Sequence, residues 1–378
     1  MVLLGVVGCG DVFFRSYAEG FRAVSTTAVA AGVCDPDPVR VRRAADLCHQ
    51  WGPRPQTYAS LDAMLDGEQL DGIVNLTPAP LHADLTRAAL RRGVHVYSEK
   101  PLAYSAQTAA ALIREARGSG CLLLCAPASM AASCMRWIKG ILADDRIGTP
   151  TLAVAQLATL GPAAWRMYTG DARGFYSDRV GPVLDLGVYA LHCITGLLGP
   201  VRRLHAMASI GMRERVILAG VGARESFRLE APDHVMLQLA LASGAQAQVL
   251  ASFAVPATRA PFLEIHCTRG TLSLREPFEA NARVDAWLYD DRRVPLEGWL
   301  THANQGFGRT PVEDLIACGI VHFVACLTGA EEPITTAAHA LHVLEIAEAA
   351  RTSIAEGGPA EVASTIDGSY SGEASAVS

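Results

Sequence analysis

Two short stretches of the sequence carry residue types that can move protons beside a carbonyl or an alcohol. The first is Glu99-Lys100-Pro101, which follows an apolar run typical of a buried strand. Lys100 is one of only two lysines among the 32 lysines and arginines of the chain. A lysine ammonium gives up its proton when it is buried or crowded, whereas an arginine guanidinium does not. Lys100 is therefore a candidate for proton transfer, the alternative being an ordinary solvated lysine after a strand.

The second stretch places Asp185, Tyr189 and His192 at positions i, i+4 and i+7 of an otherwise apolar helical run. This spacing puts an acid, a phenol and an imidazole on one helix face. Such a polar stripe can form the wall of a substrate site. The alternative is structural, with Asp185 capping the helix and the other two side chains packing half-buried, and the spacing does not decide between them.

A glycine turn near the N-terminus predicts dinucleotide binding. A short apolar strand leads into Gly8 and Gly10, and Asp11 and Val12 open a helical stretch. Strand, glycine turn and helix form the context of a dinucleotide fingerprint, in which the glycines allow a tight turn and a close approach of pyrophosphate to the helix N-terminus. The usual third glycine is replaced by Phe13, which requires a wider gap between helix and sheet or a ring turned elsewhere.

An acidic residue follows the second strand. Asp35 lies 25 positions after Gly10, near the distance at which an acid meets the adenosine ribose. A carboxylate there accepts from the 2′-hydroxyl and repels a 2′-phosphate, which favours NAD. Asp35 is also consistent with a turn and helix cap. Because Arg40, Arg42 and Arg43 follow and any of them can hold a 2′-phosphate, NADP stays open.

Apolar strands alternate with helical stretches up to about residue 125, which predicts a right-handed, mostly parallel sheet. Ligands of such sheets bind beyond the carboxyl ends of the strands. The candidate residues that fall at these ends are Gly8, Gly10, Asp35, Asn75, Thr77, Glu99 and Lys100. Their clustering at one sheet edge is stronger evidence than any single motif.

The pattern changes after about residue 129. Strand-like runs then follow one another without helices between them, which predicts a largely antiparallel sheet, and two helices close the region at 311–328 and 337–354. Small and polar residues from about 357 predict disorder. We therefore expect a doubly wound α/β domain over residues 1–128, an α+β domain over 129–356 and a disordered tail over 357–378.

Composition excludes several classes of function. A net charge of -6 gives no electrostatic footprint for nucleic acid, and no apolar run reaches the roughly 20 residues that span a bilayer. The first apolar run lacks a basic flank, so a signal peptide is not predicted and a cytoplasmic protein is expected. Cys121 and Cys125 have no second Cys/His pair at zinc spacing nearby, so no metal site is expected.

Together these motifs resemble the glucose–fructose oxidoreductase / inositol dehydrogenase family. The matching stretches are the glycine turn, Asn75-Leu76-Thr77-Pro78 with His82, Glu99-Lys100-Pro101, Asp145-Arg146-Ile147-Gly148, Asp185-Leu186-Gly187-Val188-Tyr189 and Gly270-Thr271-Leu272. The resemblance implies a Rossmann domain followed by a mixed domain with a large open sheet, which members often pair into dimers or tetramers. It also implies NAD or NADP as cofactor and a sugar, cyclitol or nucleotide sugar as substrate.

The resemblance assigns roles to individual residues. It places Lys100 at the substrate hydroxyl or carbonyl near the nicotinamide, and gives Asp185 the task of positioning substrate and lysine. Tyr189 stands where many members have histidine. A phenol has an ordinary pKa near 10, so it acts near neutral pH more readily as an acid than as a base, which favours reduction. His192 contacts the substrate or packs.

The sequence thus predicts an NAD(P)-dependent oxidoreductase that moves a hydride between nicotinamide and a sugar-like alcohol or ketone. The arginine-rich, lysine-poor composition suits a high-GC bacterium and favours a ketoreductase of secondary metabolism. Two alternatives remain: a non-enzymatic dinucleotide-binding sensor, and a reductase of a non-sugar carbonyl or imine. Selectivity is assigned to residues 159–179, with Trp165 and Arg166 as contacts, and to residues 298–309.

Overall fold

The computed structural model describes residues 1–144, 146–289, 299–302 and 308–366. The chain divides into two compact units. Unit 1 comprises Met1–Arg136, Phe278–Asn281 and Phe307–Ala340, and unit 2 comprises Trp137–Pro277, Ala282–Gly306 and Leu341–Ser378. Unit 1 therefore takes in residues 129–136, 278–281 and 307–340, which the sequence pattern assigns to the second domain.

Unit 1 is built on a parallel sheet with the strand order β3-β2-β1-β4-β5-β6. Its strands are β1 (Val2–Val7), β2 (Ala28–Cys34), β3 (Gln56–Tyr58), β4 (Gly72–Asn75), β5 (His95–Ser98) and β6 (Leu123–Cys125). This order confirms the predicted doubly wound fold. Strands β1 to β3 are added toward one edge of the sheet and β4 to β6 toward the other, so the order reverses between β1 and β4. Such a switch point opens a crevice at the carboxyl ends of the strands.

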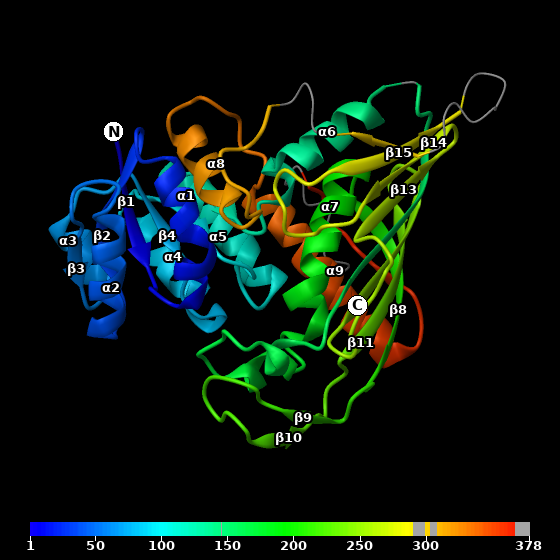
Figure 1. Cartoon of the computed structure of the whole chain (residues 1–378), viewed down its shortest axis with the longest axis horizontal. Helices are drawn as coiled ribbons and strands as arrows, with labels where there is room; N and C mark the ends of the chain where they lie inside the picture. Colours follow the sequence, from blue (N-terminus) through cyan, green and yellow to red (C-terminus); the bar gives the residue numbers. More distant parts are fainter. Residues whose placement is uncertain (145, 290–298, 303–307, 367–378) are drawn as a thin grey trace, which may run out of the picture. The chain divides into compact units, whose positions relative to one another are not determined.

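Two layers of helices flank this sheet. The helices are α1 (Ala18–Ala23), α2 (Pro38–Cys48), α3 (Leu61–Gly67), α4 (His82–Arg91), α5 (Ala106–Ser119) and α8 (Cys318–Leu327). Helix α1 contacts α2 and α8, while α4 contacts α3 and α5 (Figure 1). Asp37, Ser60 and Ser105 cap α2, α3 and α5 through their side-chain oxygens, which satisfies N–H groups that the helix itself leaves unpaired.

Phe13 is fully buried in the layer that contains α1 and α8. Its ring packs edge-on against Phe14 and Phe21, with centroids 5.2 and 6.2 Å away. The residues Phe13–Tyr17 form a π-helical turn that runs directly into α1. The expected alternatives were a wider gap between helix and sheet or a ring turned elsewhere, and the structure has the ring turned into the core. Helix α8 supplies further apolar side chains around it, including Ile320 and Phe323.

Unit 2 is built on a larger sheet whose described strands follow the order β16-β15-β14-β13-β7-β12-β11-β8-β17. They are β7 (Pro150–Ala158), β8 (Val201–Ser209), β11 (His234–Leu241), β12 (Gln246–Ser252), β13 (Leu263–Cys267), β14 (Gly270–Leu274), β15 (Val284–Leu288), β16 (Leu300–His302) and β17 (Ala360–Glu361). Strands β7 and β12 pair in parallel and the other described pairs are antiparallel. The predicted mainly antiparallel sheet is confirmed. A separate ribbon joins β9 (Glu214–Val216) to β10 (Ser226–Arg228).

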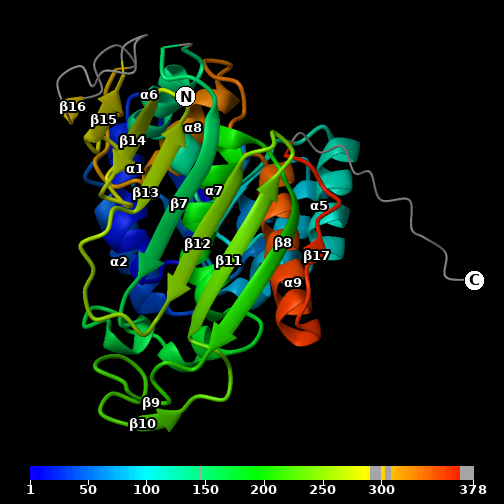
Figure 2. The same ribbon diagram turned by 90° about the vertical axis from the view of Figure 1, so that its right-hand side faces the viewer.

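One face of this sheet is covered by helices. Helix α7 (Val188–Leu198) packs on β7 and β12, and α9 (Ala337–Glu356) is tied to β8 through Ser353, whose hydroxyl accepts from the Ala206 N–H at 2.9 Å. Helix α6 (Ser133–Leu142) precedes β7. Along β8 and β11 buried residues alternate with exposed ones, as expected for a sheet with one covered face. Figure 2 shows β7, β12, β11 and β8 side by side on the open face.

The end of the described chain corrects the expectation of disorder from residue 357 onward. Strand β17 pairs with β8, Val362 is buried, and Glu345 accepts from the N–H groups of Ala363 and Ser364. Apolar contact and a strand edge, which the local composition does not reveal, hold residues 357–366 in place. Residues 367–378 lie outside the described part of the chain.

Two further observations concern the described residues alone. No helix there is long and apolar enough to cross a membrane. No group of three or more His, Cys, Asp or Glu side chains there is arranged to hold a metal ion.

Candidate functional site

The glycine turn after β1 lies at the switch point of the unit 1 sheet. Gly8 has a φ of +89°, and a Cβ at this position would lie 2.9 Å from the carbonyl group of Leu76, which follows β4. Its N–H donates to the carbonyl of Cys34 at 2.8 Å. Only glycine fits this conformation without strain. These contacts place the turn between the ends of β1, β2 and β4.

The space above the turn is open. A Cβ on Gly10 would meet no other atom within 4 Å, and the Gly10 carbonyl accepts from the N–H of Phe13 at 3.1 Å, which starts the first helical turn. Asp11 and Val12 lie in that turn. A helix start beside an open backbone surface suits an anionic group, because backbone N–H groups and the helix dipole face it. The residues present therefore fit a pyrophosphate.

Asp35 joins the end of β2 to the glycine turn. One carboxylate oxygen accepts from the Cys9 N–H at 2.8 Å, and the other from the Asp37 N–H at 2.9 Å. Each oxygen retains a second acceptor position. Helix capping is done by Asp37, whose carboxylate accepts from the Val39 N–H at 2.8 Å. Asp35 thus fixes its own turn and keeps capacity for a hydroxyl donor.

The arginines that follow Asp35 have partners of their own or lie on the surface. Arg40 pairs with Asp37 at 3.6 Å, and both side chains are about half exposed. The guanidinium of Arg43 lies 4.0 Å above the ring of Phe14, as a cation–π pair. Arg42 is exposed. A 2′-phosphate would have to draw Arg40 away from Asp37, whereas a 2′-hydroxyl needs no such change.

Asn75, Thr77 and His82 join the ends of β4 and β5. The buried Asn75 amide donates to the His82 carbonyl at 3.2 Å, and its oxygen accepts from the Thr77 hydroxyl at 2.7 Å. The ring nitrogens of His82 lie 2.7 Å from the carbonyl oxygens of Thr77 and Pro101. Asn75 and His82, expected to bind cofactor, thus have their polar groups engaged in fixing the loops around the site.

Glu99 is held from two sides at the end of β5. One carboxylate oxygen accepts from the Tyr17 hydroxyl at 2.6 Å and the other from the backbone N–H of Lys100 at 2.8 Å, while the Glu99 N–H donates to the Asn75 carbonyl at 2.9 Å. Lys100 is half-buried. Burial raises the pKa of Tyr17, and the charge of Glu99 raises it further, so the phenol remains a donor. Nothing in the sequence pattern points to Tyr17.

In unit 2, Asp185, Tyr189 and His192 are all buried. Asp185 lies in a π-helical turn, Val183–Gly187, whereas Tyr189 and His192 lie in α7. The single helix expected over this stretch is therefore two elements, and the wider turn changes the helical phase between Asp185 and Tyr189. Tyr189 and His192, three positions apart in α7, do share a face. Single π-turns inside helices are frequent at functional sites.

Trp165 belongs to an aromatic cluster that also contains Tyr168 and Phe175. The three rings meet edge-on with centroids between 5.6 and 6.1 Å apart. Arg166 is exposed. Of the other segment assigned to selectivity, residues 298 and 303–307 lie outside the described part of the chain.

Comparison with known sequences explains this combination of motifs. The profile of an oxidoreductase family with an NAD-binding Rossmann fold matches residues 2–126. The profile of the GFO/IDH/MocA C-terminal domain matches residues 135–273. The chain belongs to the glucose–fructose oxidoreductase / inositol dehydrogenase (GFO/IDH/MocA) family. The resemblance inferred from the motifs is confirmed.

Several relatives of this GFO/IDH/MocA member are named for a sugar or nucleotide-sugar substrate. D-apiose dehydrogenase of Paraburkholderia graminis is 28% identical over 95% of this chain and 89% of its own length. A dTDP-3,4-didehydro-2,6-dideoxy-alpha-D-glucose 3-reductase of Streptomyces antibioticus is 28% identical over 69% of this chain and 79% of its own. Levoglucosan dehydrogenase, solved with NADH and levoglucosan, shares the fold with a TM-score of 0.78 at 18% identity, over 96% of this chain and 99% of its own.

Proposed function

We propose that this chain transfers a hydride between a nicotinamide dinucleotide and a carbon of a sugar-like alcohol or ketone. The observation that carries the proposal is the open glycine turn at the switch point, with Asp35 bonded to it through the Cys9 N–H. Glu99 and Lys100 stand at the end of β5 in the same sheet. When bound, a nicotinamide dinucleotide supplies or accepts the hydride.

The cofactor roles follow from the contacts in unit 1. Gly8 and Gly10 admit the pyrophosphate to the helix start, where Asp11 and Val12 begin the first turn. Asp35 accepts from a ribose hydroxyl with its remaining acceptor positions, and its negative charge disfavours a 2′-phosphate. We therefore favour NAD over NADP.

The proton roles follow from the chemistry of the side chains. A tyrosine has an ordinary pKa near 10, so at neutral pH it carries a proton that it can donate to a carbonyl oxygen. We assign this donation to Tyr189, polarisation of the carbonyl to the Lys100 ammonium, and orientation of the substrate to Asp185. His192, on the same face of α7 as Tyr189, is assigned a substrate contact. Each assignment rests on the residue's place in its own unit and on the family motif that contains it.

We infer that the substrate is a sugar or nucleotide sugar. The names of the relatives support this class, and the reductase from Streptomyces supports a ketoreductase of bacterial secondary metabolism. In unit 2, Trp165 offers an aromatic face and Arg166 an exposed guanidinium that suits a phosphate or carboxylate.

We also propose that the open face of the unit 2 sheet binds a second copy of the chain. Met207, Met236 and Leu250 lie opposite one another on β8, β11 and β12 and form an apolar row. Met207 and Met236 are 71% and 41% exposed. Apolar side chains gathered on an open sheet favour a homodimer or homotetramer, because association removes them from water.

Cofactor binding is tested by titrating the protein with NADH and NADPH and following nicotinamide fluorescence. Gly10→Trp places a ring where the structure has open space and should abolish binding. Gly118→Trp is the matched control, because a Cβ at this exposed position of α5 also meets nothing within 4 Å. Wild-type protein that binds neither dinucleotide, or Gly10→Trp protein that binds normally, would contradict the proposal.

Turnover separates the enzyme from a dinucleotide-binding sensor. A panel of D-apiose, levoglucosan and a dTDP-linked 3-keto sugar is assayed by absorbance of the reduced nicotinamide. Tyr189→Phe should lower kcat by about 100-fold or more, which is the usual contribution of a general acid, and Lys100→Ala by about 100-fold, which is the usual contribution of one group that stabilises the developing charge. If the protein binds the dinucleotide but turns over no member of the panel, the result favours a sensor or a reductase of a non-sugar carbonyl or imine.

A further inference from the structure

Unit 2 buries an ion pair that the proposed chemistry does not use. Arg215, in β9, is 4% exposed and Asp233, just before β11, is fully buried. The guanidinium donates to the carboxylate, which also accepts from the N–H groups of Gly211 at 2.6 Å and Met212 at 3.1 Å. A buried ion pair is often no more stabilising than apolar residues of similar size. Stability alone therefore does not explain why this ion pair is buried at this place in the fold.

Asp233 is anchored to the large sheet. Its N–H donates to the carbonyl of Ser209 at the end of β8, and its carbonyl accepts from the N–H of Phe253 beyond β12. The carboxylate is thus fixed at the ends of three neighbouring strands. Any group that binds it takes its position from the sheet.

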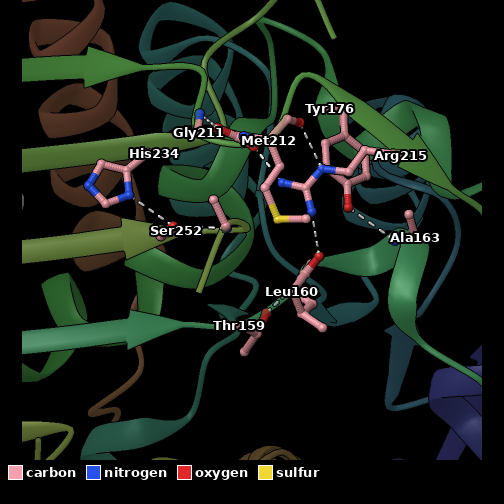
Figure 3. A network of polar contacts seen from close by, with 12 residues as sticks. Thr159, Leu160, Ala163, Tyr176, Gly211, Met212, Arg215, His234 and Ser252 are labelled. Atoms are coloured by element: carbon pink, nitrogen blue, oxygen red, sulfur yellow. Dashed lines mark hydrogen bonds and ion pairs between the residues drawn. The ribbon is translucent and has the colours of Figure 1, made fainter. Parts of the chain in front are cut away.

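Arg215 links Asp233 to the segment that follows β7. Its guanidinium donates to the carbonyl of Leu160 at 2.9 Å and, through Nε, to that of Met212 at 3.2 Å. Figure 3 shows the side chain lying between these carbonyls and the ring of Tyr176. A planar guanidinium serves several acceptors at fixed angles, which a lysine ammonium does not.

Tyr176 holds the other end of the same segment. The guanidinium of Arg215 lies 5.4 Å from its ring centroid, its hydroxyl accepts from the Ala163 N–H at 3.1 Å, and its ring packs edge-on against Phe253 at 5.1 Å. A Cβ on Gly161 would lie 2.6 Å from the Tyr176 hydroxyl, so only glycine allows this approach. Residues 160–176 therefore form a loop whose two ends meet at Arg215.

This loop carries the aromatic cluster of Trp165, Tyr168 and Phe175. Burial raises the pKa of Tyr176, and the carboxylates of Asp233 and Asp185 raise it further against the opposing effects of the Ala163 N–H and Arg215. Asp185 thus acts electrostatically on the residue that closes the loop. The geometry connects the large sheet to the loop within unit 2, through Asp233 and Arg215.

We propose that Arg215 and Asp233 are a positioning pair, which holds residues 160–176 in the shape that receives the sugar ring of the substrate. The pair sets substrate affinity and selectivity and takes no part in proton or hydride transfer. This inference rests on the proposed function for its substrate, but not for the loop geometry.

The test uses two variants of the full chain. Arg215→Met combined with Asp233→Asn removes both charges together, so neither is left buried alone, and keeps one acceptor for the N–H groups of Gly211 and Met212. Arg215→Lys keeps the charge but loses the fork of donors. Arg228→Met, on an exposed arginine of the paired strand β10, is the control.

The first readout needs no substrate. Trypsin cleavage after the exposed Arg166, followed by mass spectrometry, should be about tenfold faster in the double variant than in the wild type and Arg228→Met, because cleavage requires the loop to open. Arg215→Lys should fall between them. Cleavage at the wild-type rate in both Arg215 variants would overturn the proposal.

The second readout is the separation of KM from kcat, with the member of the sugar panel that the wild type turns over best. KM should rise about tenfold or more while kcat changes less than about threefold, and the Kd for NADH should stay at its wild-type value. Unchanged KM in both variants, or loss confined to kcat, would overturn the positioning role. Wild-type protein without NADH binding would instead contradict the proposed function, and the cleavage readout would still decide on the pair.

Discussion

The hydroxyl of Tyr17 donates a hydrogen bond of 2.6 Å to Glu99, whose other carboxylate oxygen accepts from the backbone N–H of Lys100 at 2.8 Å. A fully buried phenol at the end of the π-helical turn before α1 thus fixes the backbone of Lys100. Hydrogen bonds to a charged group are stronger than neutral ones and hold their partners in a narrower range of positions. Tyr17 is therefore a positioning residue for Lys100.

Tyr17→Phe should lower kcat several-fold with little change in the Kd for NADH. The substitution keeps the ring and removes only the donor to Glu99, at a cost of about 1.5–3 kcal/mol in unfolding free energy. Tyr58→Phe is the control, because Tyr58 donates to Glu68 at 2.7 Å in the same unit but on the edge strand β3, which β2, β1 and β4 separate from β5. Urea unfolding and steady-state kinetics measure both effects. Equal kcat in the two variants would remove Tyr17 from the site.

The sequence predicted those parts of the fold that carry a local signal. The two closing helices are expected at 311–328 and 337–354, and the structure has α8 at Cys318–Leu327 and α9 at Ala337–Glu356. Strand β3 carries no such signal, because it has three residues and the first two are exposed. Helix α8 is apolar on nearly all sides, which predicts burial without naming the partner. Its packing on α1 in unit 1 is a long-range contact that no local pattern encodes.

The candidate site shows the same division. The sequence predicts that Gly8 and Asp35 lie together, because a parallel sheet brings strand ends together, and the Cys9 N–H joins Asp35 to the glycine turn. No local pattern in the sequence predicts the pairing of Arg215 with Asp233, 18 positions apart. An arginine is expected on the surface, because most arginines lie there. The sequence predicts a regular helix where the structure has the π-helical turn that contains Asp185. Nearly all residues of this stretch are apolar, so their spacing does not distinguish a π-helical turn from an α-helical one.

Asp35→Asn should shift cofactor preference toward NADPH. Removing the negative charge relieves repulsion of a 2′-phosphate, and the ratio of the NADPH and NADH dissociation constants should fall about tenfold. The amide keeps one acceptor, so one of the two backbone bonds of Asp35 is lost. Asp46→Asn is the control on the exposed face of α2, where Asp46 pairs with Arg54 at 2.6 Å. An unchanged ratio would assign the choice of cofactor to other residues.

Met236→Glu should convert the wild-type oligomer into monomers. Met236 lies in the middle of the apolar row, directly opposite Met207 and Leu250, so an interface there would have to bury a carboxylate without a partner, at a cost of several kcal/mol. Val216→Glu is the control, since Val216 is 53% exposed in the separate ribbon. Light scattering after size-exclusion chromatography gives the masses. A monomeric wild type, or a variant of unchanged mass, would exclude this face as the interface.

His342 should make unit 2 less stable in acid. Its imidazole is fully buried, accepts from the Val201 N–H at 3.0 Å and lies 3.0 Å from the Ser364 hydroxyl. Burial lowers its pKa from 6.5 to about 4, although Glu345 opposes this shift. The unfolded chain therefore binds the extra proton first, and stability that is present above pH 6.5 is lost as the pH falls toward 4.

The loss amounts to about 3 kcal/mol in full, from 1.36 kcal/mol per pKa unit. His342→Gln keeps an acceptor for the Val201 N–H without a titrating group, so its unfolding free energy should fall less between pH 7.5 and pH 5 than that of the wild type. Burial also lowers the pKa of His322, which remains in both proteins and cancels in the comparison. Urea unfolding at the two pH values measures the difference, and parallel losses in both proteins would show that His342 is not the acid-sensitive group.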